Sequence, residues 1–219
     1  MSRPSPIVYL HGFSSSPNST KARFFAQRFS ELEIPFAVPQ LDRGDFSRLT
    51  IGGQLEVIEE TCGERPVILM GSSLGGYLAA IYGARHPSVE KLVLMAPAFE
   101  VGRRWREWMS SADLERWERE GSFPFFHYGE GREVPLHYGF LKDLENYKAC
   151  PEFRQPALVF HGRQDSVVPL AITEAFAARH SNVEVRALNA GHELTEVLDI
   201  LWEETARFLG LPNLRPVLE

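Results

Sequence analysis

Three side chains that are distant in the chain, Ser73, Asp165 and His192, have the types needed to make a serine hydroxyl reactive. A serine hydroxyl is a poor nucleophile at neutral pH, so it needs a base to take its proton and an acid to orient that base. Ser73 is the central residue of Gly71-Ser72-Ser73-Leu74-Gly75, which fits the pattern G-x-S-x-G. The order serine, aspartate, histidine is the one expected when such a set is built on an open α/β sheet. We therefore predict that these residues form a catalytic triad for acyl transfer.

The five-residue pattern alone supports this interpretation only weakly. The residues around Ser73 strengthen it. The apolar run Val67–Met70 predicts a strand, and the small residues after Leu74 predict a helix. A serine at such a sharp strand-to-helix turn is strained, and the flanking glycines let the two elements pass closely. The backbone N–H of Leu74 can then point at an oxygen that develops negative charge. The alternative is a turn serine that only caps the helix.

Other residues compete for the roles of acid and base. Asp143 and Asp199 are also carboxylates, but both lie within helical patterns and not after a strand. Asp165 has the alternative of a turn residue ahead of Pro169. His192 has the alternative of a helix-capping or loop histidine. The triad remains the prediction because it supplies one residue for each role.

Further histidines at the same predicted edge of the sheet raise the alternative of a metal site. His11 and His161 each end an apolar run, and with Asp165 and His192 they could ligate a metal ion. No HExxH or HxH spacing supports this, so we predict no metal and no cofactor. His11 is expected to pack beneath the loop that follows it. The remaining histidines are expected at the surface or in an insertion: His86, His127, His137 and His180.

Short apolar runs alternate with helical patterns along most of the chain. Strands are predicted at residues 6–10, 36–39, 67–70, 91–97, 156–162 and 183–188, and helices at 20–32, 49–61, from 74 to before Pro87, 170–179 and 194–209. This alternation indicates a parallel sheet covered by helices on both faces. Active sites of such sheets lie beyond the carboxyl ends of the strands. Ser73, Asp165 and His192 each follow a predicted strand, so we expect them to meet there.

The alternation is interrupted at about residues 99–150. Val101–Gly121 is strongly charged and predicts one or two helices, and the aromatic-turn-aromatic segment 123–138 predicts an irregular hairpin. We expect this insertion to form a cap over the strand ends that supplies the apolar walls of a pocket. The rings expected to favour an apolar acyl or aryl group are Phe123, Phe125, Phe126, Tyr128 and Tyr138. In the alternative interpretation these rings pack into the main core.

The composition predicts one domain, 1–219, with the insertion inside it. Hydrophobic residues make up 44% of the 219 residues, which is enough for a substantial core. The formal net charge of −6 argues against nucleic acid as a partner, and no apolar run is long enough to span a bilayer. Met1–Pro6 lacks a secretory signal pattern, and Cys62 and Cys150 form no disulfide framework. We expect a cytoplasmic protein with a small-molecule substrate; the sequence leaves its oligomeric state open.

Taken together, the motifs resemble those of the α/β-hydrolase superfamily. They are HGF at 11–13, GSSLGG at 71–76, HGRQDSVVP at 161–169 and AGHEL at 190–194, and each comes after or at the end of a predicted strand. The resemblance covers nearly all residues from Ile7 to Leu209. The beginning, IVYLHGF, is similar to small bacterial esterases of the YqiA type and to acyl-protein thioesterase-like members. This resemblance implies about six mainly parallel strands in the order second-first-third-fourth-fifth-sixth.

The resemblance also implies roles for the residues. Ser73 would attack the acyl carbonyl, His192 would transfer the proton, and Asp165 would orient His192. The N–H groups of Leu74 and Phe13 would hold the oxyanion, and Phe13 would also contact the substrate. The implied activity is a serine hydrolase that cleaves carboxylic esters or thioesters of small to medium acyl groups.

Several alternative functions remain open on the same fold. Amidases, C–C bond hydrolases and acyltransferases use the same triad, and a non-catalytic ligand-binding protein could keep the fold. The serine at position 73 argues against haloalkane dehalogenases and epoxide hydrolases, which resemble this family but carry aspartate there.

Overall fold

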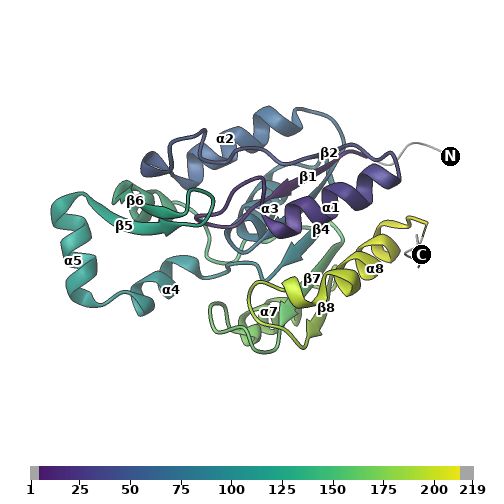
Figure 1. The fold of residues 1–219 in the computed structure, drawn as a ribbon. Coiled ribbons are helices and arrows are strands. Elements are labelled where there is room, and N and C mark those ends of the chain that lie inside the picture. The colour runs from purple at the N-terminus through teal and green to yellow at the C-terminus, as the bar shows by residue number, and fades with distance from the viewer. Residues whose placement is uncertain (1–4, 213–219) are drawn as a thin grey trace.

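The computed structural model describes residues 5–212, and its centre is a six-stranded parallel sheet (Figure 1). The strands in spatial order are β2 (Phe36–Ala37), β1 (Ile7–Leu10), β3 (Val67–Ser72), β4 (Val89–Met95), β7 (Ala157–Gly162) and β8 (Val183–Leu188). The chain moves outward from β1 to β2 and then returns to β3 on the other side of β1. Ligand sites in such sheets lie at this change of direction. The predicted α/β fold and strand order are confirmed.

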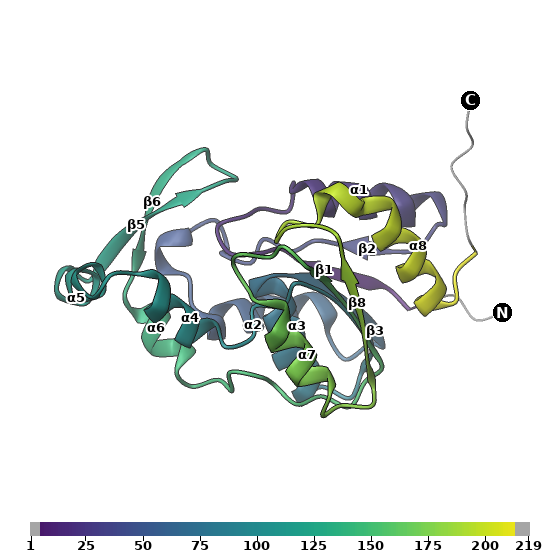
Figure 2. The same ribbon diagram turned by 90° about the horizontal axis from the view of Figure 1, so that it is seen from below.

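Helices cover both faces of the sheet (Figure 2). α1 (Thr20–Glu31) and α8 (Leu198–Leu209) lie side by side on one face. The other face is covered by α2 (Ile51–Cys62), α3 (Leu74–Arg85) and α7 (Leu170–Ala177). Every residue of β1, β3 and β7 is buried, as a strand between two helical layers requires. This burial explains why these strands read as continuous apolar runs in the sequence.

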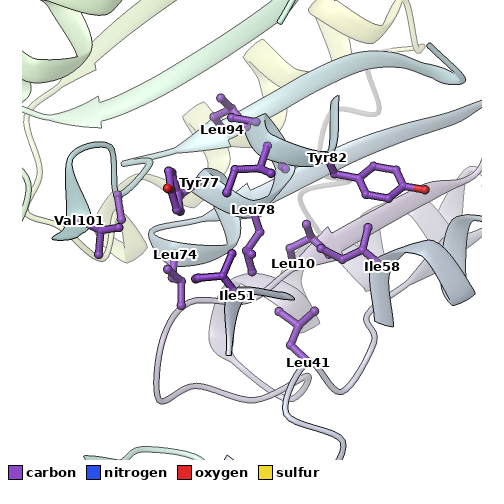
Figure 3. Packing of buried hydrophobic residues seen from close by; sticks show 14 of the residues in the cluster. Leu10, Leu41, Ile51, Ile58, Leu74, Tyr77, Leu78, Tyr82, Leu94 and Val101 are labelled. Carbon is purple, nitrogen blue, oxygen red and sulfur yellow. The ribbon is translucent and has the colours of Figure 1, made fainter. Parts of the chain in front are cut away.

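Two apolar cores form because successive strand residues point to opposite faces of the sheet. Val8 and Leu10 of β1 pack into the core beneath α2 and α3, which we call the α3-side core. Ile7 and Tyr9 pack into the core beneath α1 and α8, the α1-side core. Figure 3 shows part of the α3-side core, where Leu10 lies among side chains of α2 and α3.

The insertion lies between β4 and β7. Its elements are α4 (Val101–Trp108), α5 (Ser111–Glu120), β5 (Ser122–His127), β6 (Arg132–His137) and α6 (Gly139–Leu144). β5 and β6 pair in regular antiparallel register, so the hairpin is less irregular than predicted. Together with α5 it extends beyond one end of the sheet in both views (Figures 1 and 2). Trp105, Trp117 and Leu136 are buried in the α3-side core, so the inner side of the insertion is continuous with that core.

The observed elements differ from the predicted ones mainly at their ends. β2 is shorter than the predicted strand 36–39, because Pro39 has no N–H to donate to a sheet. The last helix begins at Leu198 and not at 194: Leu194 has a φ of 55°, and a short 3-10 turn, η2 (Thr195–Val197), follows it. A left-handed residue cannot continue a helix. The prediction for Met1–Pro6 falls mostly on residues outside the described part of the chain.

Candidate active site

Ser73 lies at the sharp turn between β3 and α3. Its φ of 53° and ψ of −117° are strained for a residue that has a side chain. A Cβ on Gly71 would lie 2.3 Å from the carbonyl oxygen of Gly75, and a Cβ on Gly75 would lie 2.0 Å from that of Leu10. Only glycine fits at either position. The two glycines therefore let β1, β3 and α3 approach closely while Ser73 stays at the end of β3.

Ser73, His192 and Asp165 form a continuous chain of hydrogen bonds. The Nε2 atom of His192 lies 2.9 Å from Ser73 Oγ, and its Nδ1 atom lies 2.7 Å from Asp165 Oδ2. Asp165 follows β7 and His192 follows β8, so all three residues come from the carboxyl ends of strands. The Asp165 side chain is fully buried, and that of His192 is 12% exposed. The structure thus brings the three predicted residues together.

The Asp165 carboxylate has several partners besides His192. Its Oδ1 atom accepts hydrogen bonds from the N–H groups of Val167 and Val168, both at 2.8 Å. The Nε2 atom of His161 lies 3.3 Å from Oδ2. Burial alone would raise the pKa of Asp165, but the hydrogen bonds from His161, His192 and Val168 outweigh burial and hold this pKa well below its ordinary value. The group that orients His192 is therefore a carboxylate at neutral pH.

His161 is a second imidazole beside Asp165, a role that the sequence analysis did not assign to it. Its side chain is fully buried, and Nε2 faces two acceptors, the Val168 carbonyl at 2.8 Å and the Asp165 carboxylate. Nε2 therefore carries the proton, and Nδ1 accepts a hydrogen bond from the Thr173 hydroxyl at 2.9 Å. The signal for this contact in the sequence is the spacing of His161 and Asp165, which lie four residues apart at the end of β7.

Phe13 and Leu74 both line the cavity next to Ser73. A Cβ on Gly12 would lie 3.4 Å from the Ser73 Cβ, so the loop after β1 passes directly against the serine. Leu74 is the first residue of α3, and its N–H has no partner within the helix. Within residues 5–212, neither N–H donates to another protein group. Two free donors beside Ser73 are suited to hold an oxyanion.

A cavity of about 650 Å³ lies next to Ser73 and His192, within the usual range for small-molecule sites. Its lining residues fall into two sets, which we call the apolar half and the polar half. The apolar half consists of Phe13, Phe99, Val101, Trp105, Trp108, Val167 and Val168, with one charged side chain among them, Arg104, which donates to the Val167 carbonyl and pairs with Glu107. The polar half is formed by the loop after β1 and the first turn of α1: Ser15, Ser16, Asn18, Ser19, Thr20 and Lys21. Phe13, which was predicted to contact substrate, lines the cavity, as does Tyr128 from the insertion.

The structure corrects the prediction for the other four rings. In the described part of the chain, Phe123, Phe125, Phe126 and Tyr138 do not line the cavity. Phe125 and Tyr138 pack on Trp117, with ring centroids 5.1 Å and 5.7 Å away. Phe126 is half exposed and packs against Tyr128. Neighbouring strand residues point to opposite sides, so Phe125 turns to the core and Phe126 to the surface.

The residues that competed with the triad in the sequence have other contacts in the structure. Asp143 accepts a hydrogen bond from the N–H of Gly52 at 2.8 Å, and Asp199 pairs with Arg28. His127 lies in the insertion, one of the two places expected for it, and is buried at the end of β5. Among residues 5–212, no cluster of three or more His, Cys, Asp or Glu side chains is arranged to hold a metal ion.

The sheet order, the serine turn and the covering helices define an α/β-hydrolase fold. The solved structure of mouse alpha/beta hydrolase domain-containing protein 10 is similar, with a TM-score of 0.77 and 21% identity over 94% of this chain and 89% of that chain. The chain belongs to the Uncharacterised protein family UPF0227, whose family model matches residues 6–208. The predicted resemblance to this superfamily is thus confirmed.

Two relatives carry hydrolase names. The palmitoyl-protein thioesterase ABHD10, mitochondrial, of Bos taurus is 27% identical over 89% of this chain and 69% of its own length. The AB hydrolase superfamily protein YisY of Bacillus subtilis strain 168 is 25% identical over 85% of this chain and 84% of its own length. These relatives support hydrolase activity.

The helices of the structure bear on whether the chain could cross a membrane. Within residues 5–212, no helix has the length and apolar character needed to cross a bilayer. The bovine relative is named as mitochondrial, so the cytoplasmic location expected from the sequence stays a prediction.

Proposed function

We propose that this protein is a serine hydrolase that cleaves carboxylic esters or thioesters of small to medium acyl groups through an acyl-enzyme intermediate. The observation that carries the proposal is the unbroken hydrogen-bond chain from Ser73 through His192 to Asp165 beside the cavity. A nucleophile in contact with a base, itself in contact with an orienting acid, is the arrangement that activates serine.

In the first half-reaction, Ser73 Oγ bonds to the acyl carbon while His192 Nε2 takes the hydroxyl proton. The carbonyl oxygen becomes an anion, which the N–H groups of Phe13 and Leu74 stabilise. Asp165 stabilises the imidazolium that forms. His192 then gives its proton to the leaving alcohol or thiol as its bond to the acyl carbon breaks. In the second half-reaction, water attacks the acyl-serine with His192 as the base, which releases the carboxylic acid and restores Ser73.

One observation supports an apolar acyl group, and another supports a thioester as the bond that is cleaved. The apolar half of the cavity offers aromatic and branched side chains next to Ser73, which suit a hydrocarbon chain or an aryl ring. The bovine relative is named a palmitoyl-protein thioesterase, which supports testing thioesters beside oxygen esters. A series of para-nitrophenyl esters and acyl thioesters of increasing length, with matched amides, will define the acyl group and the bond that is cleaved.

The assignment of Ser73 is tested with a fluorophosphonate probe, which reacts with activated serines. We expect the wild-type protein to be labelled and the Ser73→Ala variant to stay unlabelled, with an unchanged circular dichroism spectrum. Equal labelling of both proteins would show that another residue reacts. A lack of labelling and of ester turnover in the folded wild-type protein would favour a ligand-binding protein instead.

The role of His192 predicts a pH dependence. The imidazole must be neutral to accept the serine proton. We therefore expect kcat/KM for an aryl ester to fall as the pH is lowered, because protonation of a general base removes its function. A flat profile with an unchanged fold would contradict the base role of His192.

A further inference from the structure

Lys21 is a buried cation in the wall of the cavity, and the proposed mechanism does not use it. Its side chain is 7% exposed, and its ammonium group donates hydrogen bonds to the backbone carbonyl and to the carboxylate of Glu193, the latter at 3.3 Å. Burial lowers the pKa of Lys21, whereas the Glu193 carboxylate opposes this change. An ammonium has three N–H donors, and Glu193 occupies two of them.

The position of Lys21 relates it to the leaving group and not to the acyl group. Glu193 is the residue after His192, so the contact places Lys21 on the histidine side of the cavity. The leaving group must lie on this side, because His192 gives it a proton. The apolar half, built from the insertion and the loop after Asp165, remains for the acyl group.

A further feature of the polar half is suited to bind an anion. α1 begins here, and the N–H groups of Thr20 and Lys21 have no acceptor among the described residues, whereas Ser19 caps the next N–H, that of Ala22. Free N–H groups at the start of a twelve-residue helix attract negative charge.

On the basis of the proposed hydrolase function, we propose that the polar half of the cavity is a subsite for a leaving group that carries a carboxylate or a phosphate, and that Lys21 is its specificity-determining residue. The preferred substrate class is then an ester or thioester with an apolar acyl group and an anionic alcohol or thiol. The anion takes the free N–H of Lys21 and the N–H groups at the start of α1.

Glu193 sets the strength of this subsite. Its side chain is 74% exposed, so its carboxylate approaches Lys21 from the solvent side. An ion pair with such an exposed partner is weak, and a substrate anion inside the cavity competes for the same cation. Removal of the Glu193 charge therefore strengthens binding of an anionic leaving group. Removal of the Lys21 charge weakens it.

The experiment compares two chromogenic butyrate esters, para-nitrophenyl butyrate and the analogue with a carboxylate beside its nitro group. Lys21→Met keeps the length of the side chain and removes the charge. Glu193→Gln keeps the backbone carbonyl that holds Lys21 and removes the competing carboxylate. Lys148→Met is the matched control, because Lys148 is 74% exposed and lies outside the cavity wall. The steady-state KM and kcat are measured for each protein with each ester.

We expect Lys21→Met to lower kcat/KM for the anionic ester by about tenfold or more, mainly through KM, and to change the neutral ester by less than about threefold. Glu193→Gln is expected to lower KM for the anionic ester alone, and Lys148→Met to change neither. An equal loss of kcat on both esters in Lys21→Met would show that Lys21 only positions the His192 loop, and it would overturn the subsite, as would no change. If the wild-type protein cleaves neither ester and the fluorophosphonate does not label it, the hydrolase proposal itself fails; if it is labelled, the same comparison is made at the acyl length that it does cleave.

Discussion

At the scale of single residues, the centre of the site is a carboxylate between two imidazoles. Asp165 is fully buried, yet the hydrogen bonds from His161 and His192 and from backbone N–H groups keep it ionised. Unpaired burial of such a charge would be strongly unfavourable. These contacts therefore serve both the stability of the loop after β7 and the orientation of His192.

Asp165→Asn tests the catalytic part of this role. Asparagine has the same shape, but it lacks the charge that selects the productive tautomer of His192 and stabilises the imidazolium. We expect kcat to fall by about a thousandfold or more, with labelling by the fluorophosphonate slowed to match. A loss below about tenfold would show that His192 does not depend on Asp165.

The low pKa of Asp165 also predicts a pH-dependent stability. Because the pKa in the folded state is depressed, the stabilisation is fully present above the ordinary value of 3.8 and is lost as the pH falls below it. In urea unfolding, the difference in free energy between wild type and Asp165→Asn should therefore shrink as the pH is lowered below this value. A difference that stays constant down to about pH 3 would contradict the depressed pKa.

At the scale of elements, the serine turn depends on the close approach of three backbones. Gly75 lies on α3 directly against the carbonyl of Leu10, at the end of β1. A methyl group there must push apart α3, which begins with Leu74, and β1, which leads into the loop that carries Phe13. The fold of this region and the geometry of the site are thus set by the same contact.

Gly75→Ala tests this contact, with Gly102→Ala as its control. A Cβ on Gly102 in α4 meets Leu144 only at 3.5 Å, an ordinary contact. We expect Gly75→Ala to destabilise the protein by about 3 kcal/mol or more, as overpacking in a rigid interior does, and Gly102→Ala to be neutral or slightly stabilising. Thermal unfolding of both variants measures this, and similar midpoints would contradict the close approach.

The hairpin of the insertion is attached to the loop that carries Phe13. The Ser14 hydroxyl donates to the Phe126 carbonyl, and the Tyr128 N–H donates to the Ser14 carbonyl at 2.8 Å. These bonds join the end of β5 to the residue directly after the candidate oxyanion donor. The position of that donor therefore depends on the hairpin.

Ser14→Ala tests whether the hairpin orders the Phe13 loop, apart from its contribution to the stability of the fold. We expect a loss of about 1 kcal/mol in unfolding free energy and a severalfold lower kcat, because the Phe13 loop becomes less ordered. Ser110→Ala, which removes the cap of α5, should cost about the same stability with kcat unchanged. Equal kcat values for the two variants would show that the hairpin does not steady the loop.

At the scale of the whole molecule, the insertion and the sheet share one core. Trp117 is fully buried in the insertion, donates a hydrogen bond to the Leu136 carbonyl and packs on Trp105. These rings belong to the α3-side core, whereas Trp202 belongs to the α1-side core on the opposite face. A core that is continuous across the insertion and the sheet predicts cooperative unfolding.

Trp117→Ala should therefore weaken the entire fold. We expect a loss of about 3–5 kcal/mol, as for other large core truncations, with coincident unfolding transitions by tryptophan fluorescence and far-ultraviolet circular dichroism. Two separate transitions, with the insertion melting first, would show that it is an independent unit.

The amino-acid sequence alone was sufficient for the order of strands and helices and for the three residues that meet at the sheet edge. These features rest on local patterns, such as apolar periodicity and the glycines around Ser73, and on the rule that parallel strands end at one edge. Only the tertiary structure decided which aromatic rings line the cavity, because a shift of one residue along β5 reverses the direction of the side chain. It alone also paired Lys21 with Glu193, 172 residues away, and placed His161 against Asp165. Such contacts depend on how distant segments pack, which no local pattern records.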